Sequence, residues 1–279
     1  MPELPEVETI CNQLRFGNQN RKPALGLRVL SVEVLWARSI AHPNLEVFHQ
    51  QVKDKLIHKI GRRGKFLVFS LSDDFFLLIH LRMSGDLWVE SQDASIHPHH
   101  RVMFNLENHS RMVFNDSRKF GRVWLTKEPQ EILSKLGPEP LDSKLTPEDF
   151  YHRLTGRHRQ LKPLLLDQTV IAGLGNIYTD EALHLAGLHP LTLSNQLTFD
   201  QASLLLKSIQ EVLLEGISRN GASIDWVYRG GEFQNYFQVY QRTGESCYRC
   251  GEKIRRTVVG QRGTHYCPNC QPEPEHQQD

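Results

Sequence analysis

The chain has 279 residues, of which 39% are hydrophobic and 23% are charged, so its apolar side chains can fill the cores of about two globular domains. No uninterrupted apolar stretch approaches the roughly 18 residues of a membrane-spanning helix, and no signal-peptide pattern is present. We therefore expect a cytoplasmic protein with no membrane partner. The net charge of +1 excludes a uniformly basic protein.

Positive charge is nevertheless clustered along the chain. Three segments are rich in Lys and Arg and poor in acids: 53–65, 157–162 and 247–270. Such clusters are typical of proteins that bind phosphate groups, although each run is also consistent with a solvated surface.

The first half of the chain predicts one helix followed by β-strands. Between residues 5 and 19, apolar residues recur at the spacing of one helix face: Val7, Ile10, Cys11 and Leu14. Cys11 is therefore expected in the core. Seven short runs rich in Val, Phe, Leu and Trp follow, separated by turn residues: 28–36, 66–71, 75–82, 86–90, 101–107, 111–116 and 122–126. This spacing predicts a β-sandwich or barrel.

The second half changes to a helical pattern after a proline-rich linker. Thr146 is a candidate helix N-cap with Pro147 at the first helical position. Thr198 and Gln201 form a capping box before the longest apolar repeat. Helices are expected at 147–154, 161–167, 176–187 and 198–217. We predict an α+β multidomain protein with a β-sandwich domain at 1–135, a linker at 136–146, a helical domain at 147–240, a cysteine-bearing ribbon at 241–272 and a disordered tail at 273–279.

Four cysteines near the C-terminus have the spacing of a metal site. They follow the pattern Cys247-x2-Cys250-x16-Cys267-x2-Cys270, with a predicted hairpin between the two pairs. Thiolates in tetrahedral geometry suit Zn²⁺, and four protein ligands leave no open position, so we expect one structural zinc ion. The alternative, two disulfides, requires an oxidising compartment. The ribbon also has basic residues suited to phosphate contact: Arg249, Lys253, Arg255, Arg256 and Arg262.

The first residues, MPELPEVET, place a proline and two carboxylates at the start of the first helix. If Met1 is removed, Pro2 presents a secondary α-amine, whose pKa near about 7.7–8.0 leaves a useful fraction of free base at neutral pH. Such an amine can attack a sugar carbon and form an iminium. Glu3 is a candidate general acid, and Glu6, one helical turn on, is a candidate to orient the pair. The simpler interpretation is that the acids only favour a helix start.

Three motifs occur in the same order as in one known family: PELPEVET at the front, a helix–turn–helix stretch ending in GLGNIY, and the four-cysteine ribbon. Over essentially its whole length, the chain resembles the bacterial formamidopyrimidine-DNA glycosylase/endonuclease VIII family. Leu4 favours the formamidopyrimidine branch, since endonuclease VIII typically has glycine there.

This resemblance implies base excision repair of damaged double-stranded DNA by a DNA glycosylase that is also an abasic-site lyase. Oxidised purines such as 8-oxoguanine and formamidopyrimidines would be removed through a Schiff base on Pro2, and β,δ-elimination would then cut the strand. The resemblance also implies a helix-two-turns-helix DNA-binding region within 147–240 and a zinc ribbon at 241–272. A monomer suffices for this scheme.

Catalytic roles follow from the same resemblance. Pro2 matches the family's nucleophile, and Glu3 matches the proton donor in base release. Lys65, in a Gly-Lys-Phe turn, matches the β-elimination proton donor. Arg262 matches the hairpin arginine that contacts phosphate and is assigned to δ-elimination. Without the resemblance, Lys65 and Arg262 would be read as ordinary surface residues.

Residues that evert a base are also implied. An enzyme that acts on a base must take it out of the stack and fill the gap. Met83 matches the family's wedge methionine, although its type alone fits a core position. Arg118 and Phe120 match the residues that contact the orphaned base and stack beside it, and His99 matches a DNA-contacting histidine.

The helical region contributes phosphate contacts. Two glycines before Asn176 expose N–H groups where a helix begins, and such a terminus attracts phosphate. Asn176 and Lys162 match phosphate-binding residues of the family, and Arg157 matches a further basic contact.

One region departs from the family pattern. Residues 220–237 do not match the usual lesion-recognition loop, so the preferred lesion stays open. Two other functions remain possible from the sequence: an endonuclease VIII-like glycosylase for oxidised pyrimidines, and a non-catalytic zinc-ribbon DNA-binding protein.

Overall fold

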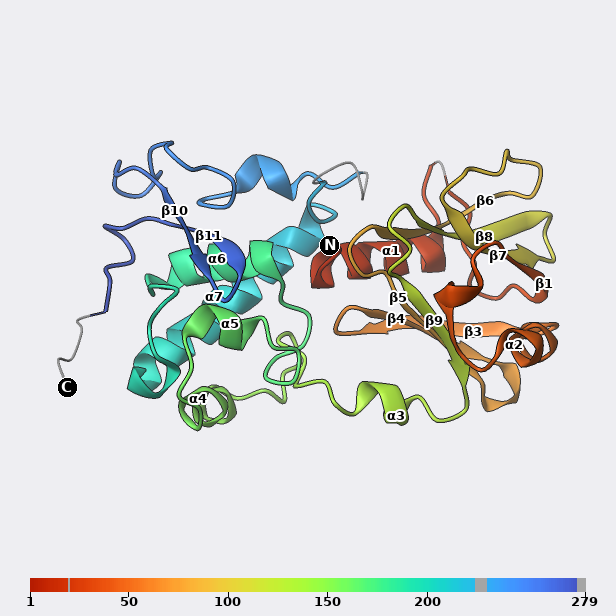
Figure 1. The fold of residues 1–279 in the computed structure, drawn as a ribbon, viewed down its shortest axis with the longest axis horizontal. Helices are drawn as coiled ribbons and strands as arrows, with labels where there is room; N and C mark the ends of the chain where they lie inside the picture. Colours follow the sequence, from red (N-terminus) through yellow and green to blue (C-terminus); the bar gives the residue numbers. More distant parts are fainter. Residues whose placement is uncertain (20, 224–229, 275–279) are drawn as a thin grey trace. The chain divides into compact units, whose positions relative to one another are not determined.

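The computed structural model describes residues 1–19, 21–223 and 230–274 (Figure 1). Its contacts divide the chain into two compact units, of which the first comprises Met1–Ser134 and Asn220–Gly231 and the second comprises Lys135–Arg219 and Glu232–Asp279. The predicted domain boundaries remain predictions, and the contacts place 220–231 with the first unit rather than with the helices around it. Among the described residues, no helix has both the length and the apolar character needed to cross a lipid bilayer.

Helix α1 (Leu4–Phe16) opens the first unit and buries one face. The Glu6 carboxylate accepts a hydrogen bond from the Glu3 backbone N–H, which closes the first turn. Pro5 lies in that turn, where its missing N–H breaks no helical hydrogen bond. The helix ends at Phe16 and is capped by Gly17, whose φ of 68° is positive, as glycine allows. The expected helix is confirmed, with a C-terminal end earlier than the predicted residue 19.

Two sheets and α1 surround one hydrophobic core. The first sheet is antiparallel and has the order β1 (Val29–Val34), β7 (His100–Leu106), β8 (Ser110–Asp116), β6 (Gly85–Ser91). The second has the order β2 (Ile40–His42), β9 (Arg122–Thr126), β5 (Phe76–His80), β4 (Phe66–Leu71), β3 (Ile57–Arg63), and its β2–β9 pair is parallel. Side chains of both sheets and Cys11 of α1 belong to one buried cluster. The predicted β-sandwich and the core position of Cys11 are therefore confirmed.

Several elements of this unit were not predicted, among them β2, β3 and α2 (Leu45–Val52). Strand β3 lies in the basic segment 53–65, and only Ile57 and Ile60 of its side chains are fully buried. A register shift between Ile57 and Lys59 also breaks the two-residue alternation that marks a strand. The remaining short elements of this unit are α3 (Gln130–Leu133), η1 (Ala37–Ser39) and η2 (Ser72–Asp74), and the second unit contains η3 (Ser194–Gln196) and η4 (Phe233–Tyr236).

The second unit is helical, as predicted, and contains a cysteine-bearing hairpin. Its helices are α4 (Pro147–Thr155), α5 (Leu161–Leu165), α6 (Asn176–Ala186) and α7 (Phe199–Ser218), and its strands are β10 (Arg255–Val259) and β11 (Arg262–Tyr266). The Thr146 hydroxyl accepts the Asp149 N–H, and Thr198 and Gln201 bond to each other's backbone, so both predicted caps are confirmed.

The buried acid Glu181 ties α6 to the segment that leads into the ribbon. Its carboxylate accepts backbone N–H groups from Gln238, Val239 and Tyr240. Burial raises the pKa of Glu181, and these hydrogen bonds oppose that shift by favouring the charged form. The approach to the ribbon is thus fixed on the same helix whose first residue is the predicted phosphate contact Asn176.

Candidate active site and DNA-contacting residues

The N-terminal residues of the first unit form a buried acidic brace. Pro2, Glu3 and Glu6 are all buried, and Glu3 is only 3% exposed. The Glu6 Oε2 atom accepts the Glu3 N–H at 2.7 Å, while its Oε1 atom accepts the Ala222 N–H at 2.8 Å. A Cβ on Gly221 would lie 2.6 Å from Glu6, so only glycine allows this close approach. Glu6 therefore holds the backbone of Glu3 on one side and the 220–223 segment on the other.

Lys65 lies in the two-residue turn between β3 and β4. Gly64 in this turn has a φ of 55°, and Lys65 is 5% exposed. The alternative prediction that Lys65 is an ordinary surface lysine is therefore wrong, because the side chain is buried. The positive charge of Lys65 is felt by His80 on β5, which packs edge-on against the Phe66 ring. The structure thus places Lys65 in the sandwich, close to the turn that begins after β5.

Burial, together with the charges of Arg82 and Lys65, lowers the pKa of His80 from 6.5 to about 3. The neutral ring accepts the Arg82 backbone N–H on Nδ1 at 3.0 Å. His80 therefore helps to shape the turn that contains Met83, because Arg82 has a left-handed φ of 56°.

This shift predicts a loss of stability in mild acid. Below about pH 6.5 the unfolded chain protonates His80, whereas the folded protein keeps it neutral until about pH 3. The stabilisation is fully present above pH 6.5 and is lost as the pH falls through this window, by about 1.4 kcal/mol per pH unit. The free energy of unfolding, measured in urea at several pH values from 7.5 to 4.5, should fall less steeply with decreasing pH in His80→Phe than in the wild type. An equal pH dependence of stability in both proteins would contradict the lowered pKa of His80.

The predicted base-everting residues come together at one end of the four-stranded sheet. Met83 lies in the turn before β6, and Arg118 and Phe120 lie in the turn after β8. Gly85 pairs with Asp116, so the two turns are neighbours. Phe120 is 48% exposed, with the Arg118 guanidinium 5.0 Å from its ring centroid. Met83 is half-buried rather than fully exposed.

His99 belongs to a third turn at the same sheet end. It is exposed, and its carbonyl accepts the N–H of Asp116 at 2.9 Å. Its Nδ1 atom lies 3.4 Å from the Arg101 guanidinium. The first unit therefore groups four of the predicted DNA-contacting residues on three adjacent turns.

In the second unit, two predicted phosphate contacts donate hydrogen bonds to the same backbone carbonyl. The Gly263 oxygen accepts Lys162 Nζ at 2.9 Å and Asn176 Nδ2 at 3.0 Å. Arg262 is the preceding residue and is exposed at the start of β11. Arg157 is not part of this group, since its guanidinium bonds to the carbonyl of Arg153.

Lys162 has no exposed surface. Its ammonium forms a buried ion pair with Asp180 at 2.6 Å, and Asp180 also accepts the backbone N–H of His265 at 2.9 Å. In this structure Lys162 therefore fixes the hairpin to α6 from inside, whereas Arg262 is exposed at the start of β11. Sequence reasoning missed Asp180, because an acid within a helix has no distinctive spacing.

The four ribbon cysteines fit a zinc ion. Their sulfur atoms all lie within 4.8 Å of one another, with Cys250 and Cys267 at 3.4 Å and Cys247 and Cys270 at 3.9 Å. Zn–S bonds of about 2.3 Å in tetrahedral geometry place sulfurs about 3.8 Å apart. A disulfide would need about 2.0 Å, and all four residues are free thiols. The donor set is the one that zinc prefers.

His184 of α6 contacts this cluster. Its Nε2 atom lies 3.5 Å from the Cys247 sulfur, and its carbonyl accepts Arg249 at 2.9 Å. An N–H donor to a zinc-bound thiolate withdraws charge from the sulfur and makes it less reactive. The sequence motif does not include this residue.

Replacing His184 should therefore loosen the metal. We expect His184→Phe to release zinc about fivefold faster to a chromophoric chelator, which corresponds to one hydrogen bond of about 1 kcal/mol. His189→Phe is the matched control, since His189 is buried in the same unit but packs against the Tyr266 ring. Equal rates of zinc release from both variants would show that a general loss of packing, rather than the bond from His184 to Cys247, caused the effect.

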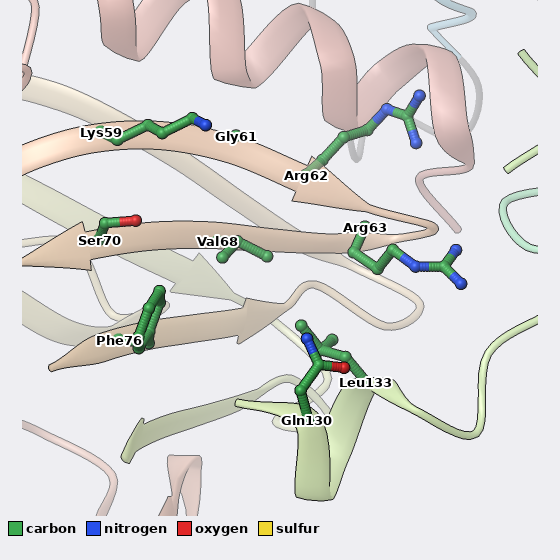
Figure 2. Close-up of a pocket in the computed structure, with 9 residues that line it drawn as sticks. All are labelled: Lys59, Gly61, Arg62, Arg63, Val68, Ser70, Phe76, Gln130 and Leu133. Carbon is green, nitrogen blue, oxygen red and sulfur yellow. The ribbon is translucent and has the colours of Figure 1, made fainter. Parts of the chain in front are cut away.

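A separate hollow of about 290 Å³ lies on the outer face of the five-stranded sheet (Figure 2). Gln130 and Leu133 of α3 face the strands across it, and Lys59 and Phe76 lie on the strand side. None of the predicted catalytic or DNA-contacting residues is among the described residues that line it. This hollow is therefore distinct from the sites above.

Comparisons with known proteins agree with this division of the chain. Residues 1–123 match the family described as the formamidopyrimidine-DNA glycosylase N-terminal domain, and residues 136–227 match its H2TH domain. Residues 244–272 match the zinc finger found in FPG and IleRS. A β-sandwich, a helical domain and a four-cysteine finger in this order define a DNA glycosylase of the base-excision type.

Individual relatives match over their full length. The formamidopyrimidine-DNA glycosylase of Protochlamydia amoebophila is 43% identical, with 97% of this chain and 99% of the relative covered. That of Pelotomaculum thermopropionicum is 44% identical over the same shares. The Lactococcus lactis Fpg in complex with an abasic site containing DNA has a TM-score of 0.89 at 38% identity, covering 97% of this chain and all of that one. The chain belongs to the formamidopyrimidine-DNA glycosylase family, which confirms the resemblance, the fold class and the zinc finger.

Proposed function

We propose that this protein removes oxidised purines from damaged double-stranded DNA and then cuts the strand at the abasic site by β- and δ-elimination. The observation that supports this most directly is the buried Glu6 carboxylate, which accepts the backbone N–H groups of both Ala222 and Glu3, the residue that follows Pro2. A group that must give up a proton at a defined place needs such a fixed and dry setting. Family membership provides independent support.

The chemistry begins at the processed N-terminus. While Met1 is attached, the Pro2 nitrogen is an amide and cannot act as a nucleophile. Removal of Met1 makes it a secondary amine, which attacks C1′ as Glu3 protonates the departing base. The bond to the base breaks, and ring opening of the sugar gives an iminium on Pro2.

Elimination follows from the iminium. It withdraws electrons from C1′ and makes the C2′ proton acidic, so loss of that proton expels the 3′-phosphate in β-elimination. A second elimination expels the 5′-phosphate, and water then releases Pro2. By family analogy, Lys65 acts in the first elimination and Arg262 in the second.

The remaining residues bind DNA in this proposal. Asn176 at the start of α6 and the adjacent Arg262 form a phosphate site, with Gly263 held in place by Lys162. Arg157 adds a further basic contact. In the first unit, the base-everting residues are Met83, His99, Arg118 and Phe120.

The four cysteines would hold one structural zinc ion, which supplies the folding energy of the ribbon rather than a catalytic position. Zinc-binding thiols must stay reduced, so we place the protein in the cytoplasm. We propose that it acts as a monomer, because each predicted role is filled by one chain.

Borohydride trapping tests the function. Reduction of the iminium should join the protein covalently to a duplex with 8-oxoguanine opposite cytosine, and peptide mass spectrometry should map the bond to Pro2. A Pro2→Gly variant is the matched control. An adduct on another side chain, or Met1 still attached in active protein, would overturn the mechanism. Faster excision of thymine glycol would indicate an enzyme for oxidised pyrimidines, and no adduct at all would indicate a DNA-binding protein without catalysis.

A further inference from the structure

We propose that Asp116 is a positioning residue for base eversion, in which one buried carboxylate holds the turns of Met83, Arg118 and Phe120 as a single rigid wedge. This inference rests on the proposed function, because it assumes that these turns enter DNA.

Asp116 is the last residue of β8 and has no exposed surface. Its Oδ1 atom accepts hydrogen bonds from the Ser84 hydroxyl and from the Arg118 N–H, the latter at 3.2 Å. Its Oδ2 atom accepts the Gly121 N–H at 2.7 Å. The Ser84 hydroxyl also accepts the Arg118 N–H at 3.1 Å, so the two turns share one closed network.

Each bond fixes a predicted DNA contact or a residue next to one. Ser84 directly follows Met83, while Arg118 and Gly121 enclose the exposed tip that includes Phe120. A Cβ on Gly121 would lie 2.2 Å from the Phe114 ring, so the end of this turn is pressed against the core. The carboxylate thus controls both turns from beneath their exposed tips.

Both tips adopt backbone conformations that need external support. Arg82 has a φ of 56° and Lys119 a φ of 63°, and left-handed residues other than glycine are strained. Neither turn would keep this shape by local preference alone. The hydrogen bonds that the Asp116 carboxylate accepts, together with the bond from the Arg82 N–H to His80, over-determine the shape, as strained functional turns require.

The backbone of Asp116 reaches the third turn. Its N–H donates to the His99 carbonyl at 2.9 Å, and its carbonyl accepts Arg101 Nε at 2.7 Å. Arg101 also donates to the Pro98 carbonyl at 2.8 Å. One residue therefore links all three turns that were predicted to contact DNA.

A carboxylate is required because each group that bonds to this side chain, on Ser84, Arg118 and Gly121, donates a hydrogen to it. Asparagine has the same shape, but its NH₂ group would face the N–H of Gly121 or the donors on the other side. At least one buried donor would lose its acceptor. In Asp116→Asn we expect the turns of Met83, Arg118 and Phe120 to fluctuate, so that they fill the gap left by an everted base less often.

The test compares two substrates in single-turnover reactions of the full-length protein. A duplex with 8-oxoguanine requires eversion of a stacked base, whereas a duplex with a preformed abasic site has no base to unstack. Asp116→Asn should slow excision of 8-oxoguanine about tenfold. Borohydride trapping on the abasic duplex should change by less than about twofold. The fluorescence rise of 2-aminopurine placed opposite the lesion, which reports unstacking, should shrink in parallel.

A milder pair of variants keeps the test valid if Asp116→Asn folds poorly. Ser84→Ala removes one donor of the network, and Ser91→Ala removes a hydroxyl at the other end of the same strand. Only Ser84→Ala should reduce excision and the 2-aminopurine signal. Equal losses on both substrates would show a merely structural role and overturn the inference, as would unchanged excision in both Asp116→Asn and Ser84→Ala. Failure of the wild type to trap on either substrate would instead reject the proposed function.

Discussion

In a Glu3→Gln variant, base release should fall by about 10²- to 10⁴-fold, because a glutamine amide is too weak an acid to protonate the departing base. Strand cleavage at a preformed abasic site should persist, since that reaction starts after the base has gone. Glutamine has the same length, and the Glu6 bond to the residue 3 backbone N–H does not depend on the replaced group. The measurement is single-turnover excision of 8-oxoguanine compared with cleavage of an abasic duplex.

Glu8→Gln is the matched control for this variant. Glu8 lies on the same helix and pairs with Arg62 at 2.9 Å and with Arg15 at 3.3 Å, away from the brace. Its replacement should leave both reactions close to the wild-type rates. If Glu3→Gln and Glu8→Gln lost excision equally, general perturbation of α1 would explain the result and Glu3 would not be the acid.

Removal of zinc should abolish DNA binding while the β-sandwich stays folded. Among the described residues, the ribbon cysteines Cys247 and Cys267 belong to a small apolar cluster with Ile254 and with Val239, which precedes the ribbon. Metal binding of about 10–16 kcal/mol would therefore supply most of the folding energy of the ribbon. Without it, the hairpin that presents Arg262 and Gly263 would no longer meet Lys162 and Asn176. Chelation should remove duplex binding in an anisotropy titration, and added zinc should restore it.

Two cysteine variants separate zinc from thiol loss in general. Cys267→Ser should reproduce the effect of chelation. Cys11→Ser should not, because Cys11 lies in the sandwich core, where its thiol donates to the Gly61 carbonyl at 3.1 Å and burial raises its pKa to about 12. Duplex binding that survives zinc removal would contradict the phosphate site on the hairpin.

Local rules predicted the elements that depend on local chemistry. The caps at Thr146 and Thr198 follow from side chains that bond within one turn, and the cysteine pairs follow from their own spacing. Strand β3 was missed because a basic run and a register shift hide its two core residues. Helix α2 had a usable signal in Asn44, which caps it through the Val47 N–H.

The family resemblance indicated the candidate site residues, which stay predictions, but the sequence did not indicate the contacts that connect them. The family resemblance indicated Lys162 as a phosphate contact, whereas the structure pairs it internally with Asp180, which lies 18 residues away. Asp116 stands in the predicted motif NDSRKFG, but its role depends on Ser84 and on a sheet register that sequence spacing does not give. Of the unmatched region 220–237, residues 224–229 lie outside the described part of the chain.

The hydrogen bond between Glu6 and Ala222 joins positions 216 residues apart. Most of the polypeptide must therefore be synthesised and emerge from the ribosome before this contact can form. During synthesis, Glu6 would hold the backbone of Glu3 without its second partner, Ala222. The growing chain would therefore react slowly with sugar aldehydes around it. Reactivity would be acquired last, when nearly the whole chain has been translated.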